Sequence, residues 1–212
     1  MNNILSLILE SYVDRILRET DTFCIQDSQT EKSMKISVVF AFAFVAMCVL
    51  ECCVSDRWEK QNTSPVCFGA KDDQFGRFYI KSNYKNLAAV RLVPLYGYVS
   101  CDTRHVSYWS YWGCGSYHGG LHKINVVITN SENQVLLPPS ELIVNDGAKW
   151  SRIPGYDSLS TELVLSFLSP SHVDYHQELR VWYGEDLMKA GEADNGGTAC
   201  VDVYAIFSPE FH

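Results

Sequence analysis

The chain has 212 residues, of which 47% are apolar and 20% are charged, as is typical of a folded globular protein. Its 25 acidic residues outnumber its 17 lysines and arginines, so the formal net charge is −8, and no two of these lysines and arginines are adjacent. This charge distribution excludes nucleic acid as a partner, because nothing in the sequence is basic enough to displace phosphate counterions.

An uncharged, almost wholly apolar run covers residues 36–50 and is preceded by two lysines. A basic flank, a short apolar run and then small residues indicate a secretory signal peptide over residues 34–55, beginning at Met34 and cleaved near Ser55. The alternative is an uncleaved signal anchor. Fifteen residues fall short of the roughly 20 that span a bilayer, so we favour cleavage and expect no membrane span in the mature chain.

Residues 1–33 precede this signal and contain one plausible amphipathic helix over residues 4–17. We interpret them as a non-structural extension, because signal peptides usually open close to their initiating methionine. The mature chain then begins with a lead-in segment over residues 56–66. That segment holds a glycosylation sequon at Asn62, which we expect to face solvent.

Eight segments of the mature chain alternate apolar and polar residues or are rich in β-branched and aromatic residues, which predicts strands. They are residues 75–81, 89–100, 123–129, 134–144, 149–153, 162–167, 178–183 and 199–207. Turn sequences such as Asn145-Asp146-Gly147 separate them, and Pro138-Pro139 predicts that the fourth is an edge strand or is split. No window shows a helical stripe. The pattern predicts an all-β fold, a disulfide-bonded β-sandwich or jelly roll over residues 67–207, with a tail at 208–212.

Four cysteines, Cys67, Cys101, Cys114 and Cys200, lie in the mature chain. An even number in a secreted chain predicts disulfides, and the absence of a Cys-x-x-Cys pair disfavours zinc. Three pairings are possible. A hairpin between Cys101 and Cys114 would join those two and leave Cys67 with Cys200, which is the pairing we favour.

Aromatic residues are dense between Cys101 and Cys114. A strand through this segment would carry aromatic rings on both of its faces, from Tyr108, Trp109, Tyr111 and Trp112. Both faces of a strand cannot belong to the core unless one of them is covered by another element. Some of these rings are therefore candidates for binding sugars or other apolar ligands. The alternative is that they pack beneath a loop.

Acidic residues gather near the C-terminus. The candidate metal ligands are Glu185, Asp186, Glu192, Asp194, Asn195 and Asp202. Oxygen ligands on a glycine-containing loop suit Ca²⁺, although the spacing is not that of an EF-hand. The alternative is a solvated acidic loop.

The sequence resembles a module of cnidarian secreted and extracellular-matrix proteins, which is found alone or beside EGF-like and fibrinogen-like domains. Three segments together carry the resemblance: residues 153–159, 179–187 and 192–204. The aromatic segment between Cys101 and Cys114 fits the same module. The resemblance covers residues 75–207. It implies an extracellular β-sandwich of the galactose-binding or discoidin-like kind, and it implies no catalytic residue.

The sequence contains no nucleophile elbow, phosphate loop or dinucleotide fingerprint, so we expect a protein that is not an enzyme. The leading hypothesis is a secreted binding or matrix module whose acidic loop holds Ca²⁺, with an extracellular glycan or a matrix or cell-surface protein as its partner. The first alternative is a lectin-like domain that binds glycans through exposed aromatic rings. The second is a secreted hydrolase that uses the loop carboxylates.

Overall fold

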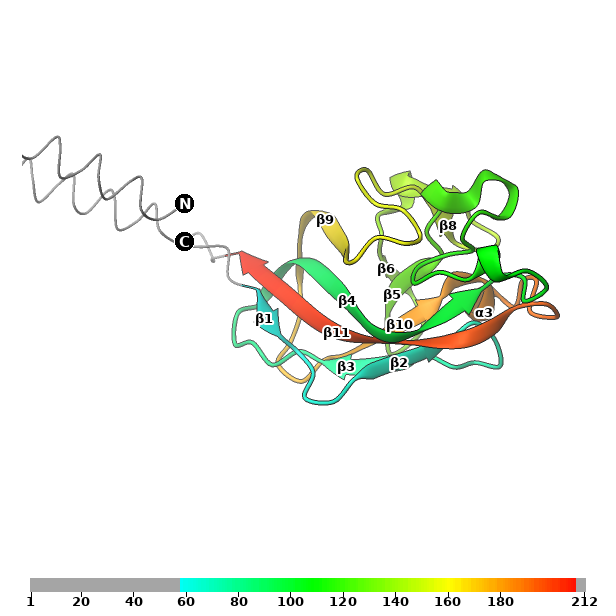
Figure 1. Cartoon of the computed structure of the whole chain (residues 1–212). Coiled ribbons are helices and arrows are strands. Elements are labelled where there is room, and N and C mark those ends of the chain that lie inside the picture. The colour runs from blue at the N-terminus through cyan, green and yellow to red at the C-terminus, as the bar shows by residue number, and fades with distance from the viewer. Residues whose placement is uncertain (1–57, 209–212) are drawn as a thin grey trace, which may run out of the picture. The chain divides into compact units, whose positions relative to one another are not determined.

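Figure 1 shows a computed structural model of the chain, in which residues 58–208 are described. The predicted extension, the signal peptide and all but the first residue of the predicted tail lie outside this range. Within it, two antiparallel sheets pack face to face, which confirms the predicted β-sandwich. Residues 58–208 contain no helix long and apolar enough to cross a membrane.

The first sheet has five strands in the order β1-β11-β4-β9, with β2 also paired to β11. Their bounds are β1 Glu59–Lys60, β2 Val66–Gly69, β4 Asn86–Ser100, β9 Leu163–His172 and β11 Gly196–Ser208. The second sheet has four strands in the order β3-β10-β5-β6. These are β3 Gly76–Tyr79, β5 Val126–Asn130, β6 Val135–Leu137 and β10 Glu178–Tyr183.

The remaining elements are short. A two-stranded hairpin joins β7 Ile143–Asn145 to β8 Trp150–Ser151. The helical turns are η1 Val106–Tyr108, η2 Tyr117–His122, η3 Ser140–Leu142 and α3 Gly184–Met188. Four of these elements, η1, η2, β7 and β8, lie on the same side of the long strands in Figure 1.

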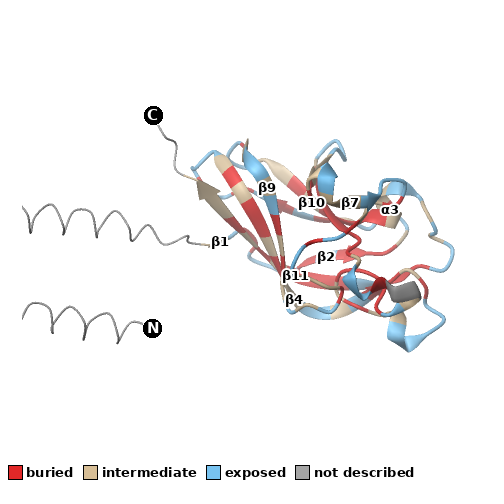
Figure 2. Cartoon of the chain, turned by 90° about the horizontal axis from the view of Figure 1, so that it is seen from above, coloured by how far each residue is buried: buried red, intermediate tan, exposed pale blue. Residues whose placement is uncertain are grey.

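The longest pairing joins β4 to β11, from Gly196 opposite Ser100 to Ser208 opposite Asn86. Buried residues recur along both strands, as the striping in Figure 2 shows. Gly97 has φ +81, and a Cβ there would lie 2.1 Å from the carbonyl oxygen of Thr198. Only glycine fits this close approach of β4 to β11.

One core fills the space between the two sheets. Inward residues of both sheets belong to the same buried cluster. Its members from the second sheet include Phe78, Val126, Ile128, Leu179 and Val181. The members from the first sheet include Leu87, Val90, Leu92, Leu163, Leu165, Val201, Val203 and Ala205. Burial of these aliphatic side chains is the main stabilising term of the fold.

All eight predicted segments contain strand, and the fourth splits into β6 and β7 around Pro138-Pro139 as predicted. The strands β1 and β2 were not predicted, and neither were the short helices η1, η2, η3 and α3. The lead-in segment is not a loose approach to the domain, since β1 pairs with Ala205 and Tyr204 of β11. The aromatic segment after Cys101 is not a hairpin but a loop that contains η1.

Two disulfides join Cys67 to Cys200 and Cys101 to Cys114, which is the pairing favoured from the sequence. Cys67 and Cys200 lie directly opposite each other on β2 and β11. The first bond closes a loop of 133 residues and the second one of 13. The long bond therefore fixes the start of the domain to its last strand.

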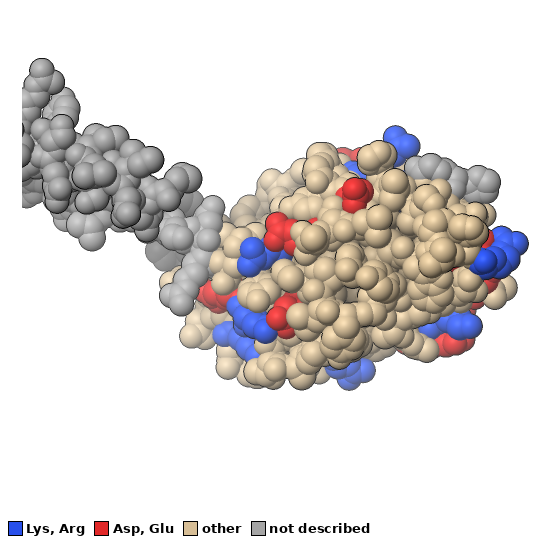
Figure 3. Space-filling view, viewed as in Figure 1, with Lys and Arg blue, Asp and Glu red and all other residues tan. Residues whose placement is uncertain are grey.

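Charged side chains do not form a single patch on the face seen in Figure 3. Lysines and arginines are interspersed with acidic residues toward the edges of that face, and a broad area between them carries no charge.

Candidate functional site

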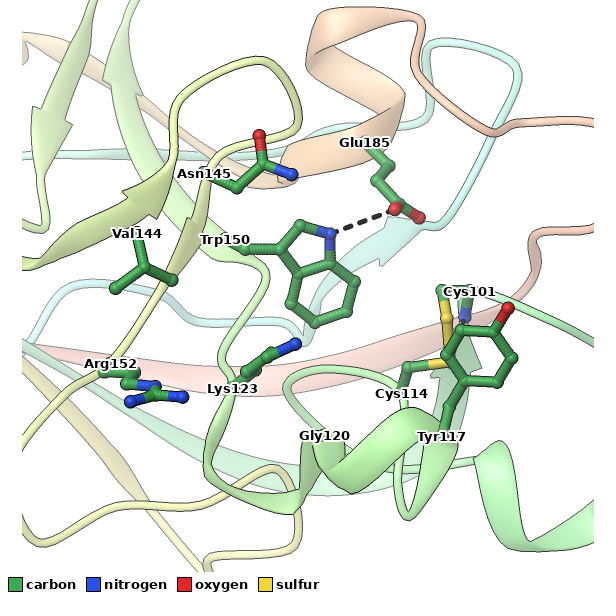
Figure 4. A pocket seen from close by; sticks show the side chains of 10 residues that line it. All are labelled: Cys101, Cys114, Tyr117, Gly120, Lys123, Val144, Asn145, Trp150, Arg152 and Glu185. Carbon is green, nitrogen blue, oxygen red and sulfur yellow. Dashed lines mark hydrogen bonds between the residues drawn. A yellow bond between two sulfur atoms is a disulfide. The ribbon is translucent and has the colours of Figure 1, made fainter.

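A pocket of about 500 Å³ lies where the loop after β4, the β7–β8 hairpin and the start of α3 meet (Figure 4). Its walls combine an aromatic ring, charged groups of both signs and a disulfide. The residues that line it are Cys101, Cys114, Tyr117, Gly120, Lys123, Val144, Asn145, Trp150, Arg152 and Glu185. The volume lies within the range of about 300–1,000 Å³ that is usual for small-ligand sites.

Trp150 of β8 forms the centre of the pocket in Figure 4. Its indole Nε1 donates a hydrogen bond to Glu185 Oε1 at 3.0 Å. Its ring also meets the buried ring of Tyr183 edge-on, with 6.4 Å between the centroids. Tyr183 is itself held by a hydrogen bond from its hydroxyl to the Gly113 carbonyl at 3.1 Å. These contacts fix the orientation of the indole before any ligand arrives.

The buried side chain of Asn125 positions Glu185 at the start of α3. Its Nδ2 donates to the Ala148 carbonyl at 2.7 Å, and its Oδ1 accepts from the Glu185 backbone N–H at 2.9 Å. Gly184 allows the close approach, because a Cβ there would lie 2.8 Å from the Ala148 carbonyl oxygen. One amide therefore joins β5, the β7–β8 hairpin and α3 beneath the pocket.

Burial raises the pKa of Glu185 above its usual value, although the hydrogen bond from Trp150 and the nearby Asn195 side chain oppose the shift. Its second oxygen, Oε2, is buried and accepts no hydrogen bond from any residue in the range 58–208. An unpaired buried acceptor costs free energy, and it is available to a ligand hydroxyl or a cation.

Two cations line the same pocket. Lys123 follows η2 and Arg152 follows β8. Between them, Ile124 and Ser151 form an antiparallel bridge with backbone hydrogen bonds of 2.9 and 2.8 Å. Lys123 and Arg152 each lie one residue from this bridge.

Four of the predicted metal ligands, Glu185, Asp186, Glu192 and Asn195, lie close together. Asn195 and Asp194 both affect the Glu185 pKa, and Glu192 affects that of Asp186. Glu192 Oε1 and Asn195 Oδ1 are buried without hydrogen-bond partners in the described part of the chain, although the Lys189 ammonium lies 3.7 Å from Glu192. The structure thus brings these four side chains near one another, and their role as metal ligands stays a prediction.

The other predicted ligands have different roles. Asp186 is fully buried and accepts the backbone N–H groups of Asp73 and Gln74, both at 2.9 Å, so it holds the β2–β3 loop. Burial raises its pKa, while those two N–H groups lower it. Asp194 is exposed on the rim, 3.8 Å from the Arg104 guanidinium.

Asp202 does not join the group, and its assignment as a shared ligand is wrong. It lies six residues along β11 from Gly196, or about 20 Å at 3.3 Å per residue. There it pairs with the Lys60 ammonium at 2.7 Å and accepts from Asn62 Nδ2 at 3.0 Å. Across residues 58–208, no three His, Cys, Asp or Glu side chains converge as metal ligands by themselves.

The four candidate aromatic residues separate into different environments. Trp112 is fully buried and donates from Nε1 to the Ser160 carbonyl at 2.7 Å, so its assignment to a binding surface is wrong. Tyr111 is partly buried against the core and stacks on Tyr98 with centroids 4.9 Å apart. Tyr108 lies edge-on to Tyr117. These rings lie on a loop and not on a two-sided strand, which is why one is core and the others are not.

Trp109 lines a second hollow with Tyr98, Val106 and Leu159. The last three are exposed side chains, and the hollow has no charged lining residue. It is the part of the predicted aromatic surface that remains open to a ligand.

Asn62 does not face solvent as expected, because its side chain is buried at 8% exposure. Its Nδ2 donates to the Ser64 carbonyl and to Asp202, and its Oδ1 accepts from the Val203 backbone N–H at 2.8 Å. A glycan linked to Nδ2 would replace one of the two donated hydrogens, so the folded structure does not favour the predicted modification.

Sequence reasoning missed Trp150, Arg152 and Lys123. One local signal existed: Trp150 and Arg152 are two residues apart on a short predicted strand, so their side chains share a face, and they follow the Asn145-Asp146-Gly147 turn. Nothing local links them to Lys123 or Glu185. Those residues join the pocket through tertiary structure only.

No protein-family model matches the chain, and no curated protein matches it. Among solved structures, the chain is similar to AJLec from the sea anemone Anthopleura japonica, with a TM-score of 0.64 and 36% sequence identity. The alignment covers 72% of this chain and 98% of AJLec.

Proposed function

Because the chain belongs to the same family as AJLec, a sea anemone lectin, we propose that it is a lectin-like domain that binds glycans and is not an enzyme. The observation that carries the proposal is the extent of the similarity, which spans 98% of AJLec at 36% identity. Two disulfides in a β domain fit an extracellular location, where the glycans of matrix and cell-surface proteins are available as ligands.

The Trp150 pocket is the site we assign to the glycan. A sugar ring presents an apolar face that packs on an aromatic ring, together with hydroxyl groups that need hydrogen-bond partners. Trp150 offers the ring, and Asn145 and Glu185 offer polar atoms around it. The indole is held by Glu185 and Tyr183, so binding does not have to order it first.

A glycan array tests this assignment. The chain should bind a subset of glycans, and Trp150→Ala should weaken that binding by about 5- to 150-fold, because stacking on an aromatic ring contributes about 1–3 kcal/mol. Trp109→Ala, in the second hollow, is the matched control and should leave binding unchanged. Loss of binding in Trp109→Ala but not in Trp150→Ala would move the site to the second hollow, and the absence of any glycan binding would refute the function.

We also propose that the acidic loop holds Ca²⁺. The supporting observation is the set of three buried oxygen atoms on Glu185, Glu192 and Asn195 that accept no hydrogen bond within the described residues. Calcium takes six to eight oxygen ligands, and carboxylate and amide oxygens are suitable ones. Bound there, the ion would neutralise the crowded carboxylates, which is chemistry that the side chains do not supply themselves.

Thermal unfolding with calcium tests this second proposal. Extracellular modules bind calcium with Kd of about 0.1–1 mM, and a hundredfold excess of a ligand over its Kd stabilises the folded state by about 2.7 kcal/mol. The melting temperature should rise between zero and 10 mM calcium, and Glu192→Gln should abolish the rise. Glu132→Gln, an exposed acid in the β5–β6 turn, should respond like the unmodified chain. A melting temperature that does not change with calcium would contradict the proposal and favour the alternative of a solvated acidic loop.

A further inference from the structure

We propose that the Trp150 pocket selects glycans that carry an anionic substituent, a sulfate or a carboxylate, which Lys123 and Arg152 bind beside the indole. The inference rests on the proposed function and narrows it, because it names the class of glycan that the pocket takes.

The first observation is the placement of the two cations. The Ile124–Ser151 bridge joins two segments one residue away from Lys123 and Arg152, and both of these side chains line the pocket. Two like charges that share a pocket repel each other. Such a pair costs stability unless an anion lies between or beside the two charges.

The second observation is that the protein supplies no such anion. Within residues 58–208, neither cation has an acidic group within ion-pair distance, whereas Lys149, next in sequence to Trp150, pairs with Asp146. Other exposed lysines in the described range also lack an acidic partner, so the lack alone carries no argument. Lys123 and Arg152 differ because both line the same pocket.

The third observation is the position of the pocket's own acid. Glu185 accepts from the Trp150 N–H, and in Figure 4 the indole lies between that carboxylate and the Lys123 ammonium. The pocket therefore has an acceptor on one side of the ring and two donors on the other. A sugar that stacks on the indole could donate a hydroxyl to Glu185 and direct its anionic group toward Lys123 and Arg152.

The chemistry of the two donors suits both anions. The planar guanidinium of Arg152 can bind two oxygens of a sulfate or carboxylate at once, and the Lys123 ammonium adds a point charge. The chain as a whole carries a net charge of −8, so it does not attract anions non-specifically. Selectivity for an acidic glycan would come from this pair alone.

The experiment is an array in which each oligosaccharide is present in a neutral, a sulfated and a sialylated form. The unmodified chain should bind at least one charged form at least tenfold more tightly than its neutral twin, and the two charged series show whether sulfate or carboxylate is preferred. Lys123→Gln and Arg152→Gln should each reduce that ratio about tenfold while binding to the neutral twins persists. Lys85→Gln, which changes an exposed cation outside the pocket, should keep the ratio.

Each outcome decides the inference. Equal or tighter binding of neutral forms by the unmodified chain would overturn the preference for anions and leave the lectin function intact. Binding of no glycan in any form would overturn both. The comparison on the unmodified chain needs no variant, so a variant that fails to fold does not weaken the test.

Discussion

Two regions of the domain hold buried or half-buried carboxylates, and they are organised in opposite ways. Around Asp202, each carboxylate oxygen has a partner: the Lys60 ammonium binds one and the Asn62 amide binds the other. Around α3, Glu185 and Glu192 each keep a buried oxygen without a hydrogen-bond partner in the described residues, although Lys189 lies 3.7 Å from that of Glu192. Accordingly, the pKa of Asp202 lies below its usual value, and burial holds that of Glu185 above it.

This difference separates a structural site from a candidate binding site. The Asp202 group fixes residues 59–62 against β11 and has no capacity left for a ligand. The α3 group pays a desolvation cost that the protein itself does not offset, and it borders the pocket. Unsatisfied polar groups of this kind identify functional sites better than the number of acidic residues does.

The largest expected effect concerns Asn62. Asn62→Ala should lower the free energy of unfolding by about 2 kcal/mol, because it leaves the buried Val203 N–H and one Asp202 oxygen without partners. Urea unfolding measures the change. Ser64→Ala removes the same sequon without removing these hydrogen bonds, so it should stay within about 0.5 kcal/mol of the unmodified chain. Equal losses in both variants would mean that glycosylation, and not hydrogen bonding, stabilises this region.

Neutralising Asp202 and neutralising Glu185 should change the melting temperature in opposite directions. At pH 7 without calcium, Asp202→Asn should lower the melting temperature by about 2–4 °C, because it weakens the interaction with Lys60. Glu185→Gln should raise it by up to about 3 °C, because the amide keeps an acceptor for Trp150 and removes a buried charge. A fall in both variants would contradict the distinction between the two regions.

The smallest effect is the pH dependence of those differences. The pKa of Asp202 is lowered in the folded state. The stabilisation that this carboxylate contributes is therefore present above pH 3.8 and is lost as the pH falls through its folded-state pKa. Glu185 has a raised folded pKa, so the folded state binds its proton first and stability from this group rises as the pH falls toward 4.5. Melting temperatures of both variants, measured from pH 7 to pH 3, should converge on that of the unmodified chain from opposite sides. Differences that do not change with pH would exclude titration as their cause.

The strands could be predicted from the sequence because the signal for a half-buried strand is local. Val201-Asp202-Val203-Tyr204 alternates inward and outward, and β11 follows that alternation. The same alternation places Asp202 on the face opposite Val203, away from the acidic loop. Counting carboxylates that are close in sequence did not take this alternation into account. β1 and α3 have two and five residues, too few to show a period.

The pocket could not be predicted in the same way, because its residues come from three segments far apart in the sequence. Asn125 joins those segments through hydrogen bonds to Ala148 and Glu185, and the Ile124–Ser151 bridge brings the segments of Lys123 and Arg152 together. The disulfides were easier to predict, since four cysteines in the mature chain allow only three pairings. Composition located the acidic loop, but only burial and hydrogen bonding distinguish its members.

The most direct test of the central claim is a crystal structure of the domain with the glycan that binds best on the array. We expect the sugar ring to lie on the Trp150 indole, with a hydroxyl near Glu185 and its anionic group between Lys123 and Arg152. A sugar bound instead over Trp109 and Tyr98, with the Trp150 pocket empty, would contradict the account.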